Sequence, residues 1–166
     1  DPDEIWSNAV EKIVKFIQNG ESVVLLCLGD TSLFASSSNI LRIIKHDYPE
    51  IITKTIPGIS SVSATAALND FDLVKKGETL IIKECPSSNK ELTSLIRESR
   101  ENKTVLAIMK VGKRWNLVRK TLKKEDIIKK SLIALSVGSP DQIIQYASQY
   151  NKDVMPYFSL ILIRFD

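Results

Sequence analysis

Residues 56–64 read Ile-Pro-Gly-Ile-Ser-Ser-Val-Ser-Ala and contain signals for a strand end, a turn and a helix start. The preceding residues, 51–56, are mostly β-branched, which is typical of a strand, and the Pro-Gly pair ends such a strand. Ser60 and Ser61 are favourable N-cap residues, and the apolar residues as far as Ala67 predict a helix. This junction therefore predicts an α/β fold in which the chain passes directly from a strand into a helix.

The same alternation continues on both sides of the junction. Before it, helices are predicted over residues 5–17 and 38–45, on either side of an apolar run that indicates a buried strand over 22–28. After it, strands are predicted over 79–83, 104–110, 132–137 and 157–164, and helices over 89–100, 114–122 and 141–149. This pattern indicates helices on the faces of a sheet, and we place a domain boundary near Pro57.

The composition is that of a folded protein without a strong charge bias. The 166 residues are 43% hydrophobic and 26% charged, with a formal net charge of +3. Such a chain can form one domain or two small ones with a packed core. Its positive charge is spread along the sequence, whereas a nucleic-acid-binding protein concentrates it. We therefore expect no nucleic-acid partner, and we interpret the lysines as solvated surface or as groups that steer an anionic ligand.

The cysteine and histidine content predicts no metal site. Cys27 and Cys85 are far apart, and His46 is the single histidine. These residues do not form a C-x-x-C pair or a set of zinc ligands, so reduced thiols of a cytoplasmic protein are the simplest interpretation. The sequence also lacks a run of about 20 apolar residues, and we expect no membrane partner.

Two segments follow predicted buried strands and carry polar groups that suit a ligand. Residues 29–38 begin Gly-Asp and continue with several serines, and residues 57–64 contain Pro-Gly followed by Ser-Ser. Ligands of open α/β sheets collect outside the carboxyl ends of the strands. Glycine lets the backbone approach a ligand, and a helix start supplies free N–H donors. The alternative for each segment is an ordinary turn.

Taken together and in this order, the segments resemble the tetrapyrrole (corrin/porphyrin) methylase family. The resemblance is carried by Gly29-Asp30, by Leu33-Phe34-Ala35-Ser36 and by residues 56–64. Residues 108–113 (Ile-Met-Lys-Val-Gly-Lys) and 156–163 (Pro-Tyr-Phe-Ser-Leu-Ile-Leu-Ile) are similar to its precorrin-2 or cobalt-factor II C20-methyltransferase branch. The resemblance extends from about Trp6 to the end of the chain.

The resemblance implies an S-adenosylmethionine (SAM)-dependent C-methyltransferase that methylates C20 of precorrin-2 in cobalamin biosynthesis and releases S-adenosylhomocysteine (SAH). It implies two α/β domains with SAM between them, and a homodimer. The implied cofactor residues are Gly29, Asp30, Thr31, Phe34, Pro57, Gly58, Ser60, Ser61, Met109, Lys110, Val111, Ala134, Leu135 and Ser136. The expected substrate-binding residues are Ser36, Lys113 and Arg114. We assign no catalytic base, because His46 is best interpreted as a surface residue.

The sequence also departs from the family pattern. Thr31 stands where proline is usual, and Phe34 stands where the C20 enzymes usually carry tyrosine. The strand and Gly-Pro-Gly-Asp loop with which the family begins are not in this sequence. We therefore expect a fragment, with 1–56 as the C-terminal part of the N-terminal α/β domain and 57–166 as the C-terminal α/β domain. We expect this fragment to be inactive by itself.

Other functions are compatible with the same fold. A family member that methylates ribosomal RNA or the diphthamide precursor is one alternative, and a non-catalytic ligand-sensing domain is another. A dinucleotide-dependent dehydrogenase is not indicated, because no G-x-G-x-x-G follows any predicted strand. Methyl transfer from SAM mainly requires that the two reactants are held close and correctly oriented, so no nucleophilic side chain is needed.

Overall fold

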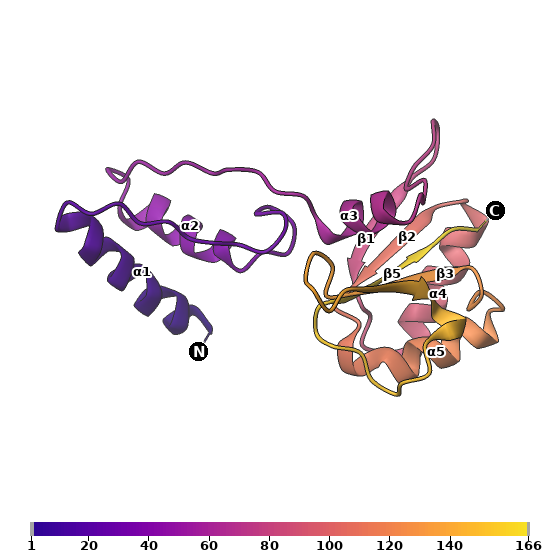
Figure 1. Cartoon of the computed structure of the whole chain (residues 1–166). Coiled ribbons are helices and arrows are strands. Elements are labelled where there is room, and N and C mark those ends of the chain that lie inside the picture. The colour runs from indigo at the N-terminus through magenta and orange to yellow at the C-terminus, as the bar shows by residue number, and fades with distance from the viewer. Residues whose placement is uncertain (1, 166) are drawn as a thin grey trace. The chain divides into compact units, whose positions relative to one another are not determined.

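The computed structural model describes residues 2–165, and the chain divides into two compact units, Asp1–Ser60 and Ser61–Asp166 (Figure 1). We call them unit 1 and unit 2. The division falls shortly after the Pro57-Gly58 turn. None of the helices in the described chain is long and apolar enough to cross a bilayer.

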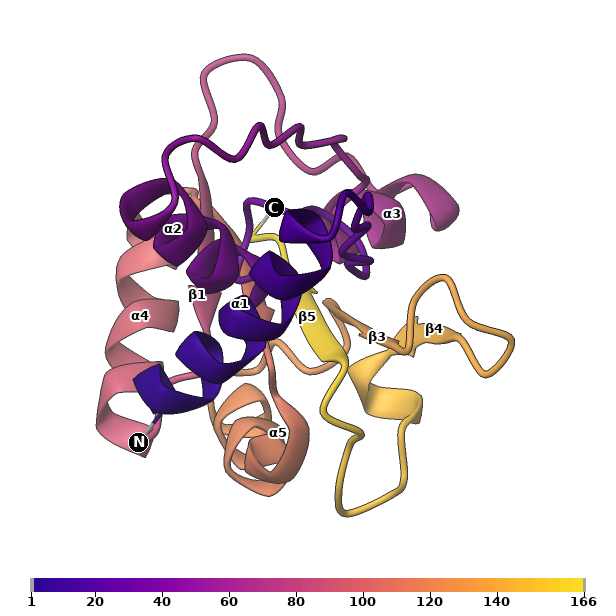
Figure 2. The same ribbon diagram turned by 90° about the vertical axis from the view of Figure 1, so that its left-hand side faces the viewer.

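Unit 1 is held together by two helices, as the helical spacing of its apolar residues predicts. They are α1 (Pro2–Gln18) and α2 (Ser37–Asp47). Val10 and Val14 of α1 are one turn apart and therefore share a face, as do Ile40 and Ile44 of α2. These four side chains are buried against one another in a single cluster, and the two helices lie side by side (Figure 2).

The strands predicted over 22–28 and 51–56 are not formed, and this prediction was wrong. Within the described part of unit 1, both segments run as extended loops and neither forms a β-strand (Figure 1). Most of their apolar side chains are exposed, including Leu26 at 89% and Ile52 at 97%, whereas Ile51 packs partly against the helix cluster. An extended segment gains stability only when neighbouring strands satisfy its backbone and cover its side chains. The strand-like composition of these two segments was therefore not sufficient to form strands without neighbouring strands to pair with.

Unit 2 is an α/β unit built on a five-stranded sheet, which confirms the predicted fold class. The strands are β1 (Leu80–Glu84), β2 (Val105–Met109), β3 (Ser131–Leu135), β4 (Ile143–Tyr146) and β5 (Ser159–Ile163). Their order is β1-β2-β5-β3-β4. β1 and β2 are parallel, whereas β5 is antiparallel to both of its neighbours, β2 and β3.

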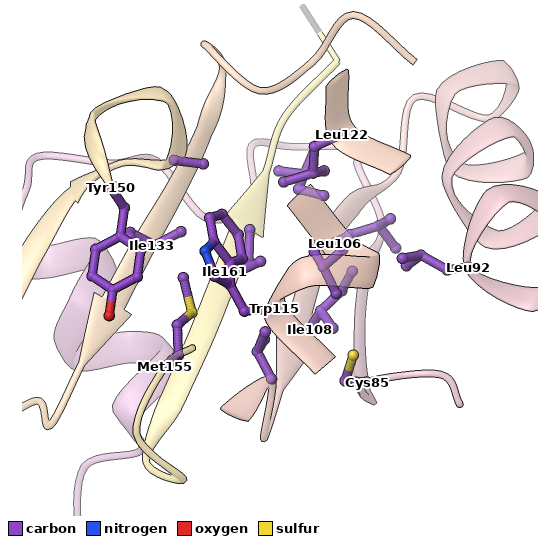
Figure 3. Packing of buried hydrophobic residues seen from close by; sticks show 14 of the residues in the cluster. Cys85, Leu92, Leu106, Ile108, Trp115, Leu122, Ile133, Tyr150, Met155 and Ile161 are labelled. Carbon is purple, nitrogen blue, oxygen red and sulfur yellow. The ribbon is translucent and has the colours of Figure 1, made fainter. Parts of the chain in front are cut away.

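Side chains of the central strands alternate between two apolar clusters on opposite faces of this sheet. On one face, Ile108, Ile133 and Ile161 pack with residues of α4 (Asn89–Glu101) and α5 (Trp115–Lys124). Figure 3 shows the fully buried Trp115 of α5 in this cluster. On the other face, β2, β3 and β5 pack with Val62 of α3 (Ser61–Leu68). Both faces of the sheet are therefore covered, and its strand ends remain as the place for a ligand.

The helix predicted over 141–149 was wrong, because this segment forms β4 and the short 3₁₀ helix η2 (Ala147–Gln149). Ile143 pairs with Leu135, and Tyr146 pairs with Leu132, so β4 completes the edge of the sheet beside β3. The segment Ile-Ile-Gln-Tyr is rich in β-branched and aromatic residues, which suit a pleated surface. Pairing with β3 therefore outweighed the helical spacing of its apolar residues.

Candidate functional site

The carboxyl ends of three strands meet at one edge of the unit 2 sheet. β1 and β2 are parallel, and β2 and β3 point the same way because each is antiparallel to β5. Met109 near the end of β2 and Ala134 near the end of β3 are both register partners of Leu160 in β5. The fold thus brings the predicted cofactor residues 109–111 and 134–136 to the two sides of one strand.

The backbone turns sharply just after β2 and just after β3. Lys110 has φ 55° and Ser136 has φ 48°, in the left-handed region that costs a non-glycine residue about 1–2 kcal/mol. Hydrogen bonds from β5 and the residue before it hold both turns. The Ser136 N–H donates to the Phe158 carbonyl at 2.8 Å, and the Val111 N–H donates to the Ser159 carbonyl at 3.3 Å. Backbone strain that is held in this way tends to gather at functional sites.

Side chains at this edge combine apolar and polar groups. Ala134 and Leu135 are buried, as is Val111, whereas Met109 and Ser136 are partly exposed. Lys110 lies 3.8 Å from the Glu84 carboxylate, which follows from the parallel pairing of β1 with β2. The buried side chains of Val111, Ala134 and Leu135 belong to the core of the sheet, so a ligand at this edge would contact the adjacent backbone and the partly exposed Met109, Lys110 and Ser136.

The two basic residues assigned to the substrate differ in their surroundings. Arg114 is partly buried, and its Nη1 donates to the Cys85 carbonyl at 3.1 Å, directly after β1. Lys113 is exposed. Arg114 therefore connects the end of β1 to the residues after β2, whereas Lys113 presents its charge to solvent.

Cys85 lies beside Arg114 but does not have the properties of a nucleophile. Its side chain is buried, and this burial raises the pKa of the thiol to about 11. A thiol with this pKa is protonated near neutral pH, and the thiolate is the reactive form. The Cys85 N–H donates to the Met109 carbonyl at 2.8 Å, which extends the pairing of β1 with β2.

In unit 1, the two predicted ligand segments lie against each other. A Cβ atom at Gly58 would overlap the carbonyl oxygen of Gly29, so only glycine fits at position 58 without a shift of the backbone. Gly29 itself has φ 78°, a conformation that glycine adopts without strain. The residues after both predicted strands are therefore brought together, although the strands themselves are not formed. Pro57 precedes this contact and is exposed.

Asp30 follows Gly29 and is fixed by the next serine. Its Oδ1 accepts the Ser32 N–H and the Ser32 hydroxyl, both at 2.7 Å. These hydrogen bonds lower the pKa of Asp30 below its ordinary value, so the carboxylate is ionised at neutral pH. A charged acceptor held in this way can bind a ligand hydroxyl or ammonium group.

The remaining predicted residues of unit 1 form the turn that leads into α2. Phe34 has φ 53° and is 44% exposed, and Thr31 is partly exposed. Ser36 occupies the N-cap position of α2, but its side chain makes no capping hydrogen bond. Ser60 is the last residue of unit 1, and Ser61 begins α3 in unit 2.

Two surface hollows lie elsewhere, along α4 and α5. The larger, about 500 Å³, is lined by polar and charged side chains of α4 together with Lys124, and the smaller, about 360 Å³, by residues of α5 with Asn89. Neither includes a strand-end residue, and the strand edge is better supported because strained, hydrogen-bonded backbone gathers there. Among residues 2–165, no group of three His, Cys, Asp or Glu side chains could hold a metal ion.

The family described as Tetrapyrrole (Corrin/Porphyrin) Methylases matches residues 2–148, which is most of the chain. The chain belongs to this family. Members of the tetrapyrrole methylase family are SAM-dependent methyltransferases. The resemblance inferred from the strand-end segments is therefore confirmed.

A curated relative of this chain agrees with the family assignment. The cobalt-precorrin-2 C(20)-methyltransferase of Salmonella typhimurium is 24% identical over 161 residues, which are 96% of this chain and 65% of that protein. The chain thus spans about two thirds of the length of this curated relative.

Two solved structures share the fold. The methyltransferase CobJ has a TM-score of 0.67 at 20% identity, over 99% of this chain and 71% of its own. The cobalt precorrin-4 methyltransferase CbiF has a TM-score of 0.73 at 16% identity. The match covers 95% of this chain and 70% of the CbiF chain. At these identities the likeness shows the fold alone.

Sequence reasoning missed the residues that hold the strand-end turns of unit 2. Phe158 and Ser159 contributed to the prediction only as members of the segment 156–163, yet Phe158 binds the backbone after β3 and Ser159 binds the backbone after β2. The only signal was their position before the apolar residues of β5. Their role depends on the insertion of β5 between β2 and β3, which the sequence does not reveal.

Proposed function

We propose that this tetrapyrrole methylase binds SAM and methylates a carbon of a tetrapyrrole, with C20 of precorrin-2 in cobalamin biosynthesis as the preferred acceptor. The observation that carries the cofactor assignment is the strand edge of unit 2, where two left-handed turns flank β5. The C20 preference is supported by the Salmonella relative, which aligns with nearly the whole chain. The domain assignment of 1–56 and 57–166 is part of the same proposal.

Each unit, taken by itself, carries groups that suit a part of SAM. In unit 2, the partly exposed Met109 and the backbone beside the buried Val111, Ala134 and Leu135 suit an adenine ring. In unit 1, the ionised Asp30 suits a ribose hydroxyl or the ammonium of the amino-acid end, and the glycines at 29 and 58 let the backbone approach. SAM supplies a methyl group that is already activated. The residues of the chain therefore act by binding and orientation.

The tetrapyrrole is proposed to interact with polar side chains of the chain, namely Lys113, Arg114 and Ser36. It carries several carboxylates, and Lys113 is an exposed cation at the start of the helical segment after β2. Arg114 adds a second positive charge while it bonds to the Cys85 carbonyl. Ser36 in unit 1 is an exposed hydroxyl at the start of α2.

We further propose a cytoplasmic homodimer, as the family resemblance implies.

Calorimetric titration of the 166-residue chain with SAH tests the cofactor assignment. We expect saturable binding that is weakened by Asp30→Asn and unchanged by Asp47→Asn, an exposed carboxylate of α2. Absence of SAH binding would contradict the assignment for this chain. Methylation is then assayed with precorrin-2, with its cobalt form and with a later corrin intermediate, both for the 166-residue chain and for a longer protein that contains it. Equal transfer to all three substrates by the longer protein would contradict the C20 preference. Product formed by the 166-residue chain itself would contradict its expected inactivity.

A further inference from the structure

Ser159 is a buried serine whose bonds converge on the turn after β2. It is the first residue of β5 and is 5% exposed. Its hydroxyl accepts the Gly112 N–H at 2.9 Å and donates to the Pro156 carbonyl at 2.7 Å. Its own carbonyl accepts the Val111 N–H at 3.3 Å. One residue therefore holds two consecutive amides of the segment that follows β2.

The segment held by Ser159 has a conformation that its own sequence does not favour. Lys110 has φ 55°, Val111 has φ −61° and Gly112 has φ 43°, so the backbone changes hand at each step. Gly112 adopts a positive φ without strain, but Lys110 has no intrinsic preference for the left-handed region. Such a conformation persists only when the surrounding structure imposes it. The bonds from Ser159 are well placed to do so.

We propose that Ser159 is a positioning residue that sets the Lys110–Val111 backbone for binding of the SAM adenosine. This inference rests on the proposed function, because the same backbone is assigned to the cofactor there. The competing explanation is that the Ser159 hydroxyl only satisfies buried polar groups, as many buried serines do. If Ser159 positions the backbone, loss of its hydroxyl should weaken SAH binding. If the hydroxyl only satisfies buried polar groups, its loss should lower stability and leave SAH affinity unchanged.

Ser131 provides a matched control for this comparison. It is the first residue of β3, it is fully buried, and its hydroxyl donates to the Ile127 carbonyl at 2.8 Å. Ser131 pairs with Ile163, the last residue of β5, so it lies at the edge of the sheet opposite to Ser159. Both serines thus begin central strands and bond to backbone, but only Ser159 contacts the turn after β2.

The test measures SAH affinity by calorimetry and stability by urea unfolding for Ser159→Ala, Ser159→Thr and Ser131→Ala in the 166-residue chain. We expect Ser159→Ala to weaken SAH binding about tenfold, which corresponds to ~1.4 kcal/mol. Ser159→Thr keeps the hydroxyl and should restore most of the affinity. Ser131→Ala should lower the urea midpoint by a similar amount without changing affinity. Unchanged affinity in Ser159→Ala, or an equal loss in both alanine variants, would overturn the proposal.

Hydrogen exchange separates failure of this inference from failure of the proposed function. If the wild-type chain does not bind SAH, the cofactor assignment fails. The claim that Ser159 sets the turn is still tested by the hydrogen-exchange rates of the Val111 and Gly112 amides. Faster exchange of both amides in Ser159→Ala than in Ser131→Ala supports that claim. Equal exchange in the two variants shows that the turn holds without Ser159, which overturns it.

Discussion

Gly58 lies directly against the carbonyl oxygen of Gly29, in a contact that leaves no room for a side chain at position 58. The two glycines are far apart in the sequence, and each follows an extended apolar segment. This contact fixes the relative position of the Gly29-Asp30 and Pro57-Gly58 turns within unit 1. The steric constraint at Gly58 therefore also determines where the proposed cofactor residues of these two turns lie relative to one another.

Substitution of Gly58 by alanine is expected to weaken SAH binding and to destabilise unit 1. The added methyl group must displace the backbone at Gly29, and overpacking of this kind costs about 1–3 kcal/mol. Gly77→Ala is the control, because Gly77 has φ 86° but no atom within 4 Å of the added methyl group. It should cost stability through its backbone conformation alone and leave SAH affinity unchanged. Calorimetry and urea unfolding of both variants check this, and wild-type affinity in Gly58→Ala would exclude a role for the contact in binding.

Asp30 is expected to contribute to SAH binding as a carboxylate over a wide pH range. Hydrogen bonds from Ser32 lower its pKa, so it stays ionised as the pH falls towards the ordinary value of about 4. SAH affinity lost in Asp30→Asn should therefore be nearly constant between about pH 5 and 8. Calorimetric titrations at several pH values measure this. A difference between wild type and variant that already disappears near pH 6 would show that another group is responsible.

The sequence was informative where local patterns control the structure. Helical spacing located α1 and α2, and the serine pair at 60–61 located the start of α3. It failed for residues 22–28 and 51–56, because their strand-like composition stabilises a strand only if another strand pairs with them. It failed for β4 because Ile143 and Ile144 satisfy both helical and strand patterns, and pairing with β3 was invisible.

The sequence proposed residues for the candidate site, but it did not reveal how they are arranged. Met109 and Ala134 become neighbours only because β5 lies between β2 and β3, and strand order is not encoded in local periodicity. The left-handed turns also escaped detection, because lysine and serine carry no preference for positive φ. Gly112 was the one residue whose type could have indicated an unusual backbone after β2.

Glu125 is expected to stabilise unit 2 by joining the end of α5 to α4. Its side chain is 5% exposed and accepts hydrogen bonds from Arg97 at 2.8 Å and from Arg100 at 3.4 Å. Both arginines are more than a third exposed, which weakens these interactions by solvent screening. Glu125→Gln should therefore cost roughly 1–2 kcal/mol at pH 7. Glu98→Gln, on the exposed side of α4, should cost little.

The stabilisation by Glu125 should depend on pH in a defined direction. Hydrogen bonding from Arg97, followed by its positive charge, lowers the pKa of Glu125 in the folded state. Its contribution is therefore complete above the unfolded pKa of about 4.3, and it is lost as the pH falls through the lower folded value. The difference between the urea midpoints of wild type and Glu125→Gln should be largest at pH 7 and should shrink as the pH falls below the unfolded pKa of about 4.3. A constant difference over this range would refute the ionic explanation.

The two cysteines should differ in their rate of reaction with a thiol reagent at pH 8. Cys27 is partly exposed, whereas Cys85 is 3% exposed and its burial raises the pKa to about 11. Because only the accessible thiolate reacts, we expect one fast equivalent from Cys27 and one slow equivalent that becomes fast in urea. Cys27→Ser should remove the fast phase, and Cys85→Ser should remove the slow one. Fast labelling of Cys85 in the folded chain would mean that the end of β1 opens readily, and the Arg114 bond to the Cys85 carbonyl would then not hold that edge of the sheet closed.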